Sequence, residues 1–175
     1  MKLFGLEPED FEGRHQMVCA AFDAGQLDLD QYLDRTIFYR PRPFRKQDVR
    51  DFMYAQSEAL PDSLALMARL AQARQVFLAT LNNESRELNL HRIEKFGLRD
   101  YFSAFFSSCY LGVSKPHTEI YRLALDISQR RAEECVFIDD RSLNLETARR
   151  LGLHTIQFLN AGQMTDDLRR LGVEI

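Results

Sequence analysis

A hydroxyl, an ammonium and a pair of carboxylates stand just beyond short apolar runs of this sequence. They are Thr80, Lys115, Asp139 and Asp140. Paired carboxylates supply the hard oxygen ligands that Mg²⁺ takes in proteins, usually together with a phosphate of the substrate. An ammonium and a hydroxyl beside them offset the charge of a phosphoryl group. The four residues therefore predict a magnesium-dependent site for phosphate transfer.

The elements around these residues predict a scaffold that brings them together. From Gln75 onward, short apolar runs alternate with segments of helical periodicity. Strands are expected over residues 76–79, 105–108, 136–138 and 155–158. Such alternation is typical of βαβ units, and the fold class predicted is α/β, with a Rossmann-like parallel sheet and helices on both faces. Ligands of these sheets bind beyond the carboxyl ends of the strands, where the four side chains would converge.

The first third of the chain has a different character. It reads as helices only, expected over residues 8–25, 30–38 and 46–60, with Asp28 as the N-cap of the second. Thr165 is expected to cap the last helix of the chain. We therefore predict two parts: an all-helical module over residues 6–58 and an α/β core over residues 59–175.

Each candidate side chain also has a purely structural explanation. A threonine at a strand end is commonly a turn residue, a lysine before a proline is commonly a solvated loop residue, and two aspartates after a strand can cap the next helix. Taken singly, these explanations are the simpler ones. The functional interpretation rests on the position of all these residues at one edge of one sheet.

Composition sets outer limits on the function. The 175 residues are 45% hydrophobic and 28% charged, which is ordinary for a globular protein, and the net charge of −3 gives no general attraction to nucleic acid. No apolar run reaches the length of a membrane span, and the N-terminus lacks the apolar middle of a signal peptide, so a cytoplasmic location is expected. The three cysteines show no CxxC spacing, and Cys109 and Cys135 are expected to be buried, inert thiols.

Three motifs resemble those of the haloacid dehalogenase superfamily, in the same order and spacing. Residues 76–82 (VFLATLN) resemble its second motif, and residues 114–116 (SKP) resemble its third. Residues 137–144 (FIDDRSLN) resemble the fourth, in the form found in metal-dependent phosphatases. The helical module resembles the family's inserted cap, so the resemblance covers nearly the whole chain.

The resemblance implies a role for each matching residue. Thr80 would bind the transferring phosphoryl group with Asn82 nearby, and Lys115 would stabilise the nucleophile and the phosphate. Asp139 and Asp140 would hold Mg²⁺, and Asn144 would brace their loop. The implied activity is a phosphatase of a small phosphorylated metabolite that works through an aspartyl-phosphate, with no nucleic-acid or membrane partner.

The family's first motif, an apolar strand that ends in Asp-x-Asp, has no counterpart here. Its first aspartate is the nucleophile and its second the general acid/base in the phosphatases. Met1–Phe4 is too short and carries no aspartate. Asp28-Leu29-Asp30 matches in letters, but it follows a helix end, and its aspartates are expected to cap the next helix. Without the nucleophile, this chain is expected to show no meaningful phosphatase turnover.

The missing motif is also a missing strand, because in the family it lies between the strands that end at Thr80 and Asp139. Its loss would leave unpaired backbone groups on both sides. Three explanations stay open: a longer natural protein, a truncated and poorly folded product, or a sheet that closes around the gap. Two other functions also stay open, a metal-free haloacid dehalogenase, against which the Asp139-Asp140 pair argues, and a non-catalytic binding module.

Overall fold

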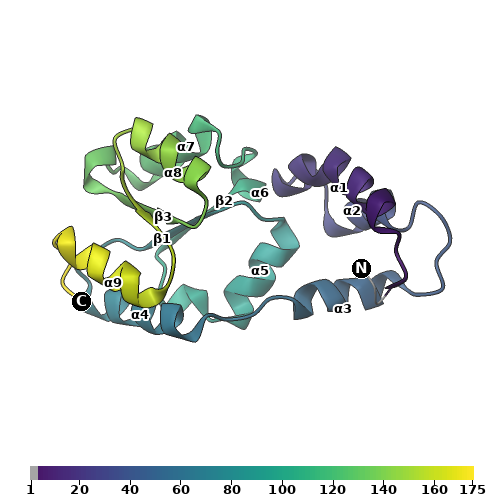
Figure 1. Cartoon of the computed structure of the whole chain (residues 1–175), viewed down its shortest axis with the longest axis horizontal. Coiled ribbons are helices and arrows are strands. Elements are labelled where there is room, and N and C mark those ends of the chain that lie inside the picture. Colours follow the sequence, from purple (N-terminus) through teal and green to yellow (C-terminus); the bar gives the residue numbers. More distant parts are fainter. Residues whose placement is uncertain (1–3) are drawn as a thin grey trace.

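The computed structural model describes residues 4–175 (Figure 1). Its helices are α1 (Pro8–Asp23), α2 (Leu29–Thr36), α3 (Lys46–Ala55), α4 (Pro61–Ala73), α5 (Arg86–Lys95), α6 (Ser108–Leu111), α7 (Thr118–Ser128), α8 (Ser142–Arg150) and α9 (Ala161–Arg170). Its strands are β1 (Ala79–Asn82), β2 (Ala104–Ser107), β3 (Val136–Asp139) and β4 (His154–Gln157). Two 3₁₀ turns cover Leu98–Asp100 and Ala132–Glu134.

The α/β fold class is confirmed, but the strands form two small sheets. β1 pairs with β2, and β3 pairs with β4, both in parallel and each across a helical connection. Helices α4 and α9 lie on one side of the strands, and α7 and α8 lie on the other (Figure 1). Two apolar clusters follow these layers. One joins α4 and α9 to β3 and β4 through Leu70, Leu168 and Ile156, and the other joins α7 and α8 to Phe137.

β1 and β3 face each other across a gap that no strand fills within residues 4–175. Of the three explanations left open by the sequence, the one in which the sheet closes around the gap is therefore wrong for this structure. Closure would require the backbone groups of β1 to pair with those of β3, yet among residues 4–175 each of the two pairs with another strand only on its outer side, β1 with β2 and β3 with β4.

The helical segment α1–α3 has its own apolar core. Leu29, Leu33 and Ile37 are almost fully buried there, together with Phe22 and Tyr32, whose rings stack. Apolar residues of α2 recur at helical spacing and turn toward α1, because residues three and four apart share one face of a helix.

Helix α1 meets the core at a glycine. Gly25 follows α1 with φ +69°, and a Cβ at this position would lie 2.2 Å from the backbone oxygen of Cys109 in α6. Only glycine combines this left-handed backbone with such a close approach. Beside it, the Ser108 hydroxyl donates to the carbonyl of Asp23 at 2.5 Å, and Glu87 of α5 accepts from the backbone N–H of Leu29 at 3.1 Å. These contacts dock the helical segment onto the core.

Several expected boundaries are corrected. The first strand runs over Ala79–Asn82 and not over 76–79, so Thr80 lies within it; pairing with β2 starts only at Ala79. The third helix ends at Ala55 and not near Leu60. Thr165 lies inside α9, whose N-cap is Asn160. Asp28 caps α2 through its side chain as expected, with Gln31 completing a capping box.

Candidate functional site

Lys115 lies at the centre of the candidate site. Its ammonium donates to the Asp139 carboxylate Oδ2 at 2.7 Å and to the backbone carbonyl of Leu81 at 2.7 Å. It thereby bridges the gap between β1 and β3. Both side chains of the ion pair are largely buried, at 11% exposure for Lys115 and 5% for Asp139. An ammonium has three N–H donors, so one donor remains after these two bonds.

Asp139 ends β3 and is held in place from several directions. Its Oδ1 accepts from the backbone N–H of Arg141 at 2.9 Å and from the Asn144 amide at 3.0 Å. Burial opposes ionisation of this carboxyl group, but the hydrogen bonds from Lys115, Arg141 and Asn144 outweigh it, and the pKa of Asp139 is lowered from its ordinary value. The carboxylate is therefore charged at neutral pH. The Asn144 side chain thus contacts Asp139 itself, at the end of β3.

The two asparagines at the end of β1, Asn82 within the strand and Asn83 after it, have different surroundings. The Asn82 amide donates to Asn89 of α5 at 3.0 Å, so it is turned toward that helix. Asn83 instead makes two bonds with the backbone of Lys115: it donates to the carbonyl at 2.8 Å and accepts from the N–H at 2.7 Å. Sequence reasoning missed Asn83 as a positioning residue. Its place beside Asn82 at the strand end was the only available signal, because its partner is 32 positions away.

Two hydroxyl groups at this edge are buried without a hydrogen-bond partner among residues 4–175. They belong to Thr80 and to Ser114, which precedes Lys115. A buried hydroxyl without a partner costs free energy, and natural proteins usually satisfy such groups. The two hydroxyls are therefore available to an acceptor that enters from outside, such as a phosphoryl oxygen.

The carboxylates can be tested for their fit to Mg²⁺. A carboxylate offers about four lone-pair positions, and at Asp139 three of them accept from Lys115, Arg141 and Asn144. One position remains on Oδ2. Asp140 follows directly, and both aspartates line the same cavity. Two carboxylates match the number that Mg²⁺ commonly takes from a protein. No cluster of three or more His, Cys, Asp or Glu side chains lies in the part of the chain that the structure describes. The two carboxylates therefore fit an Mg²⁺ ion whose remaining ligands come from water or substrate.

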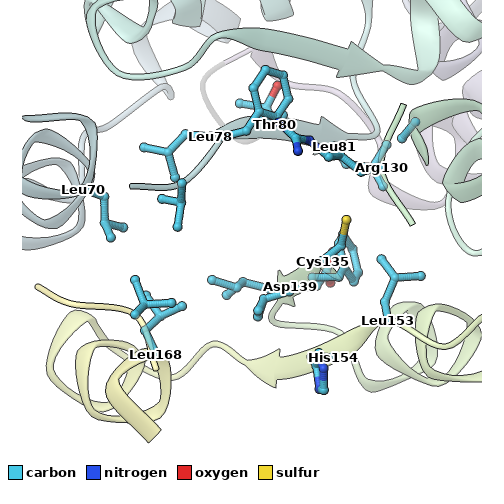
Figure 2. Close-up of a pocket in the computed structure, with 18 of the residues that line it drawn as sticks. Leu70, Leu78, Thr80, Leu81, Arg130, Cys135, Asp139, Leu153, His154 and Leu168 are labelled. Carbon is cyan, nitrogen blue, oxygen red and sulfur yellow. The ribbon is translucent and has the colours of Figure 1, made fainter. Parts of the chain in front are cut away.

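The gap between the two sheets forms an open cavity of about 1240 Å³. Figure 2 shows Leu78, Thr80 and Leu81 on one wall and Asp139 on the other, with Leu70 of α4 and Leu168 of α9 at one end. The cavity exceeds the roughly 300–1,000 Å³ of ordinary small-molecule pockets. The candidate site thus opens into a space left by the divided sheet.

The helical segment contributes an acidic group near the site. Burial raises the pKa of Asp23, at the end of α1, while the nearby charges of His15 and Arg141 oppose that rise. The Ser108 hydroxyl, directly after β2, donates to the Asp23 carbonyl, so the end of α1 lies beside the carboxyl end of β2.

The parallel strands and crossover helices, with the Lys115–Asp139 pair at the carboxyl end of β3, are the arrangement in which α/β folds bind ligands. The chain belongs to the haloacid dehalogenase-like hydrolase family, whose family model matches residues 3–152. Flavin mononucleotide hydrolase 1 of Arabidopsis thaliana is 29% identical over 173 residues, which are 98% of this chain and 69% of that protein.

Two other curated relatives are matched over smaller shares of their length. The ribulose-1,5-bisphosphate 5-phosphatase of Halopiger xanaduensis is 30% identical over 100 residues, 57% of this chain and 41% of that protein. Bifunctional epoxide hydrolase 2 of Sus scrofa is 34% identical over 79 residues, 45% of this chain and 14% of that protein.

Solved structures share the fold. A HAD family enzyme of Bacteroides thetaiotaomicron, crystallised as a magnesium complex, superposes with a TM-score of 0.81 at 19% identity, over 97% of this chain and 86% of that one. The L-2-haloacid dehalogenase of Xanthobacter autotrophicus superposes with a TM-score of 0.62 at 18% identity, over 95% of this chain and 71% of that one. No helix among residues 4–175 is long and apolar enough to cross a membrane.

Proposed function

We propose that this chain carries the phosphate- and metal-binding part of a Mg²⁺-dependent phosphatase that acts on a small phosphorylated metabolite. The observation that carries the proposal is the buried Lys115–Asp139 pair at 2.7 Å, whose aspartate lines the same cavity as the unpartnered hydroxyl of Thr80. Asp139 lies at the end of β3, where parallel α/β sheets bind ligands, and Thr80 lies within β1. Flavin mononucleotide is the first substrate to test, because the Arabidopsis relative that matches 98% of this chain is a hydrolase of it.

Different residues of the chain would bind the phosphoryl group and the metal ion. Lys115 would neutralise charge on the phosphoryl group with its remaining N–H donor, and Thr80 and Ser114 would donate their hydroxyl protons to its oxygens. Asp139 and Asp140 would hold Mg²⁺, which when bound neutralises phosphate charge and orients the group. Asn83 and Asn144 would act through Lys115 and Asp139, whose positions they fix. Asn82 is the weakest of the proposed phosphate ligands, since its amide is bonded to Asn89.

Residues 6–58 would serve as a cap over this edge, followed by the core over residues 59–175. The separate apolar core of α1–α3 and the contact of its Asp23 carbonyl with Ser108, directly after β2, support this assignment. The nucleophile of the family's aspartyl-phosphate route would come from an aspartate on a strand between β1 and β3. Asp28 is unsuited to that role, because its carboxylate caps α2 by accepting from the Gln31 N–H at 2.7 Å.

The experiment compares the 175-residue chain with a chimera that adds the first strand and loop of the Arabidopsis relative before Met1. With Mg²⁺ and flavin mononucleotide, the chain alone is expected to release phosphate no faster than a blank. The chimera is expected to show Mg²⁺-dependent release, lost when its grafted aspartate is changed to asparagine and strongly reduced by Lys115→Met. Rapid release by the chain alone would contradict the assignment of the nucleophile.

Two further outcomes decide between the alternatives. A folded chimera that releases halide from a 2-haloacid without added metal, and no phosphate, would favour a dehalogenase. A folded chimera with neither activity on a panel of phosphate esters would overturn the phosphatase proposal and favour a non-catalytic binding module.

A further inference from the structure

A second cavity lies at the amino ends of β1 and β2. Its volume of about 590 Å³ is within the roughly 300–1,000 Å³ of ordinary small-molecule pockets. Its walls include the segments that precede the two strands, residues 74–78 before β1 and residues 99–103 before β2. Lys115 instead contacts the Leu81 carbonyl, near the carboxyl end of β1. The four residues of β1 span about 13 Å at about 3.3 Å each, so a small ligand in this cavity lies away from Lys115.

Three arginines line this cavity, which we call the arginine pocket: Arg74, Arg99 and Arg130. Among the described residues that line it, Asp100 is the one carboxylate, so the lining carries a net charge of +2. Charges of one sign gathered in a cleft concentrate the electric field there and attract ions of the opposite sign. The pocket therefore favours a ligand with two or more negative charges.

The N–H donors of these arginines are unused. A guanidinium has five of them, yet within residues 4–175 no side chain of the three donates a hydrogen bond or forms an ion pair, with Asp100 or any other carboxylate. The Arg130 Cζ lies 5.9 Å from the centre of the Phe77 ring, and the Arg99 Cζ lies 6.0 Å from that of Phe105. A guanidinium over a ring uses its face and keeps its N–H groups in its own plane. The donors are thus available to an incoming oxyanion.

Helix ends offer a purely structural explanation for two of the arginines. Arg74 is the C-cap of α4, and Arg130 directly follows the C-cap of α7, where the helix dipole stabilises a cation. An arginine at a helix end can also donate to the last carbonyls of that helix, but neither side chain does so here. Arg99 lies in the short 3₁₀ turn Leu98–Asp100 and lines the pocket from the β2 side. Helix ends therefore do not explain why all three arginines line one pocket.

We propose that the arginine pocket binds a compact oxyanion with two or more negative charges, a diphosphate or a polycarboxylate, at a site separate from the one around Lys115. Phosphate and carboxylate groups share the pair of oxygens that a planar guanidinium bonds with two parallel N–H groups. The pocket takes no part in the proposed phosphatase reaction. Its ligand binding is measured without turnover, so failure of this proposal and failure of the proposed function are distinguishable.

The test is isothermal titration calorimetry of the purified 175-residue chain in metal-free buffer. Inorganic pyrophosphate is the probe in one arm and citrate is the probe in the other. Saturable binding of one anion per chain is expected in at least one arm, together with a rise in Tm at saturation. The arm with the lower Kd identifies the source of the oxygens.

Variants locate the bound anion. Arg99→Gln and Arg130→Gln change exposed side chains and should each raise the Kd about tenfold or more, because each removes charge-assisted hydrogen bonds. The matched control is Arg122→Gln, which removes an exposed arginine of α7 that does not line the pocket and should leave the Kd unchanged. Thr80→Val removes a hydroxyl from the candidate active site and should also leave the Kd unchanged.

Three outcomes would overturn the proposal. The first is the absence of saturable binding in both arms. The second is an equal rise of the Kd in Arg122→Gln and in Arg99→Gln, which would indicate general attraction to a positive surface. The third is weaker binding in Thr80→Val with unchanged binding in both pocket variants, which would place the anion at the candidate active site.

Discussion

The helical segment and the α/β core differ in how completely their interiors are filled. In the helical segment, Leu33 is 0% exposed and belongs to one apolar cluster with residues of α1 and α3. In the core, Ile138 and Leu78 lie beside an open cavity, with helices on both sides and no strand between them among residues 4–175.

The difference between the two interiors reflects how strongly each region depends on residues that are distant in the sequence. A helix satisfies its backbone groups internally, so α1–α3 need only bury their apolar faces against one another. A parallel strand satisfies its backbone groups only through neighbours on both sides, and these come from distant positions. The core therefore has an open groove between β1 and β3, where no strand lies between them among residues 4–175. At one end of this groove, Lys115 joins the two strands through the Leu81 carbonyl and the Asp139 carboxylate.

The largest effect is expected from removing that bridge. Lys115→Met preserves length and apolar stem but leaves the buried Asp139 carboxylate without its cation and the Leu81 carbonyl without its donor. Breaking one side of a buried pair costs about 3–5 kcal/mol. Urea denaturation at pH 7 measures the loss. The matched control is Arg131→Met, which removes an exposed ion pair with Glu134 and should change the stability little.

The pH dependence of this loss has a definite sign. In the native chain the pKa of Asp139 is lowered, so its stabilising contribution is present above the ordinary aspartate range and is lost as the pH falls through the lowered value. In Lys115→Met, the buried carboxyl can take up a proton when the pH falls, which removes the unpaired charge. The two chains should therefore become closer in stability at pH 4 than at pH 7. A constant difference would show that Lys115 acts through packing alone.

The second prediction compares the two interiors directly. Leu33→Ala in the filled helical core should cost about 2–5 kcal/mol, because it leaves a cavity among packed neighbours. Ile138→Ala removes as many methyl and methylene groups from a side chain that borders an existing cavity, so it should cost less than half as much. Urea denaturation of the two variants gives both values. Equal losses would mean that the core is filled in solution and that the contrast between the regions is wrong.

The same contrast between local and distant contacts explains which parts of the structure the sequence predicted. Local signals identified the helices, the Asp28 cap and the presence of each strand, because capping and periodicity are set by nearby residues. The bounds of β1 were wrong by three positions, since they depend on where β2 begins to pair. The Lys115–Asp139 pair followed from the rule that strand ends converge, but its bond to the Leu81 carbonyl and the support from Asn83 depend on contacts that no local pattern encodes.

The smallest loss of stability is expected from substitutions at Asp28, in the one Asp-x-Asp sequence of the chain. Asp28 accepts from the Gln31 N–H at 2.7 Å, and the Gln31 side chain accepts from the Asp28 N–H at 3.1 Å. Loss of such a cap costs about 0.5–2 kcal/mol, so Asp28→Ala should lower the stability of the chain by about 1 kcal/mol. Asp28→Ser preserves a capping oxygen without a carboxylate and should restore most of that loss.

The same pair of variants separates a structural aspartate from a catalytic one. In the chimera that releases phosphate, Asp28→Ala and Asp28→Ser should leave kcat unchanged at a temperature where both are folded, because the Asp28 carboxylate is committed to the α2 N-terminus. A nucleophile tolerates neither change, since a serine hydroxyl cannot form the aspartyl-phosphate. A loss of kcat in Asp28→Ser that accompanies native stability would move the nucleophile into the helical segment. The helical segment would then carry a catalytic residue, which contradicts the interpretation of this segment as a self-contained structural region beside an incomplete core.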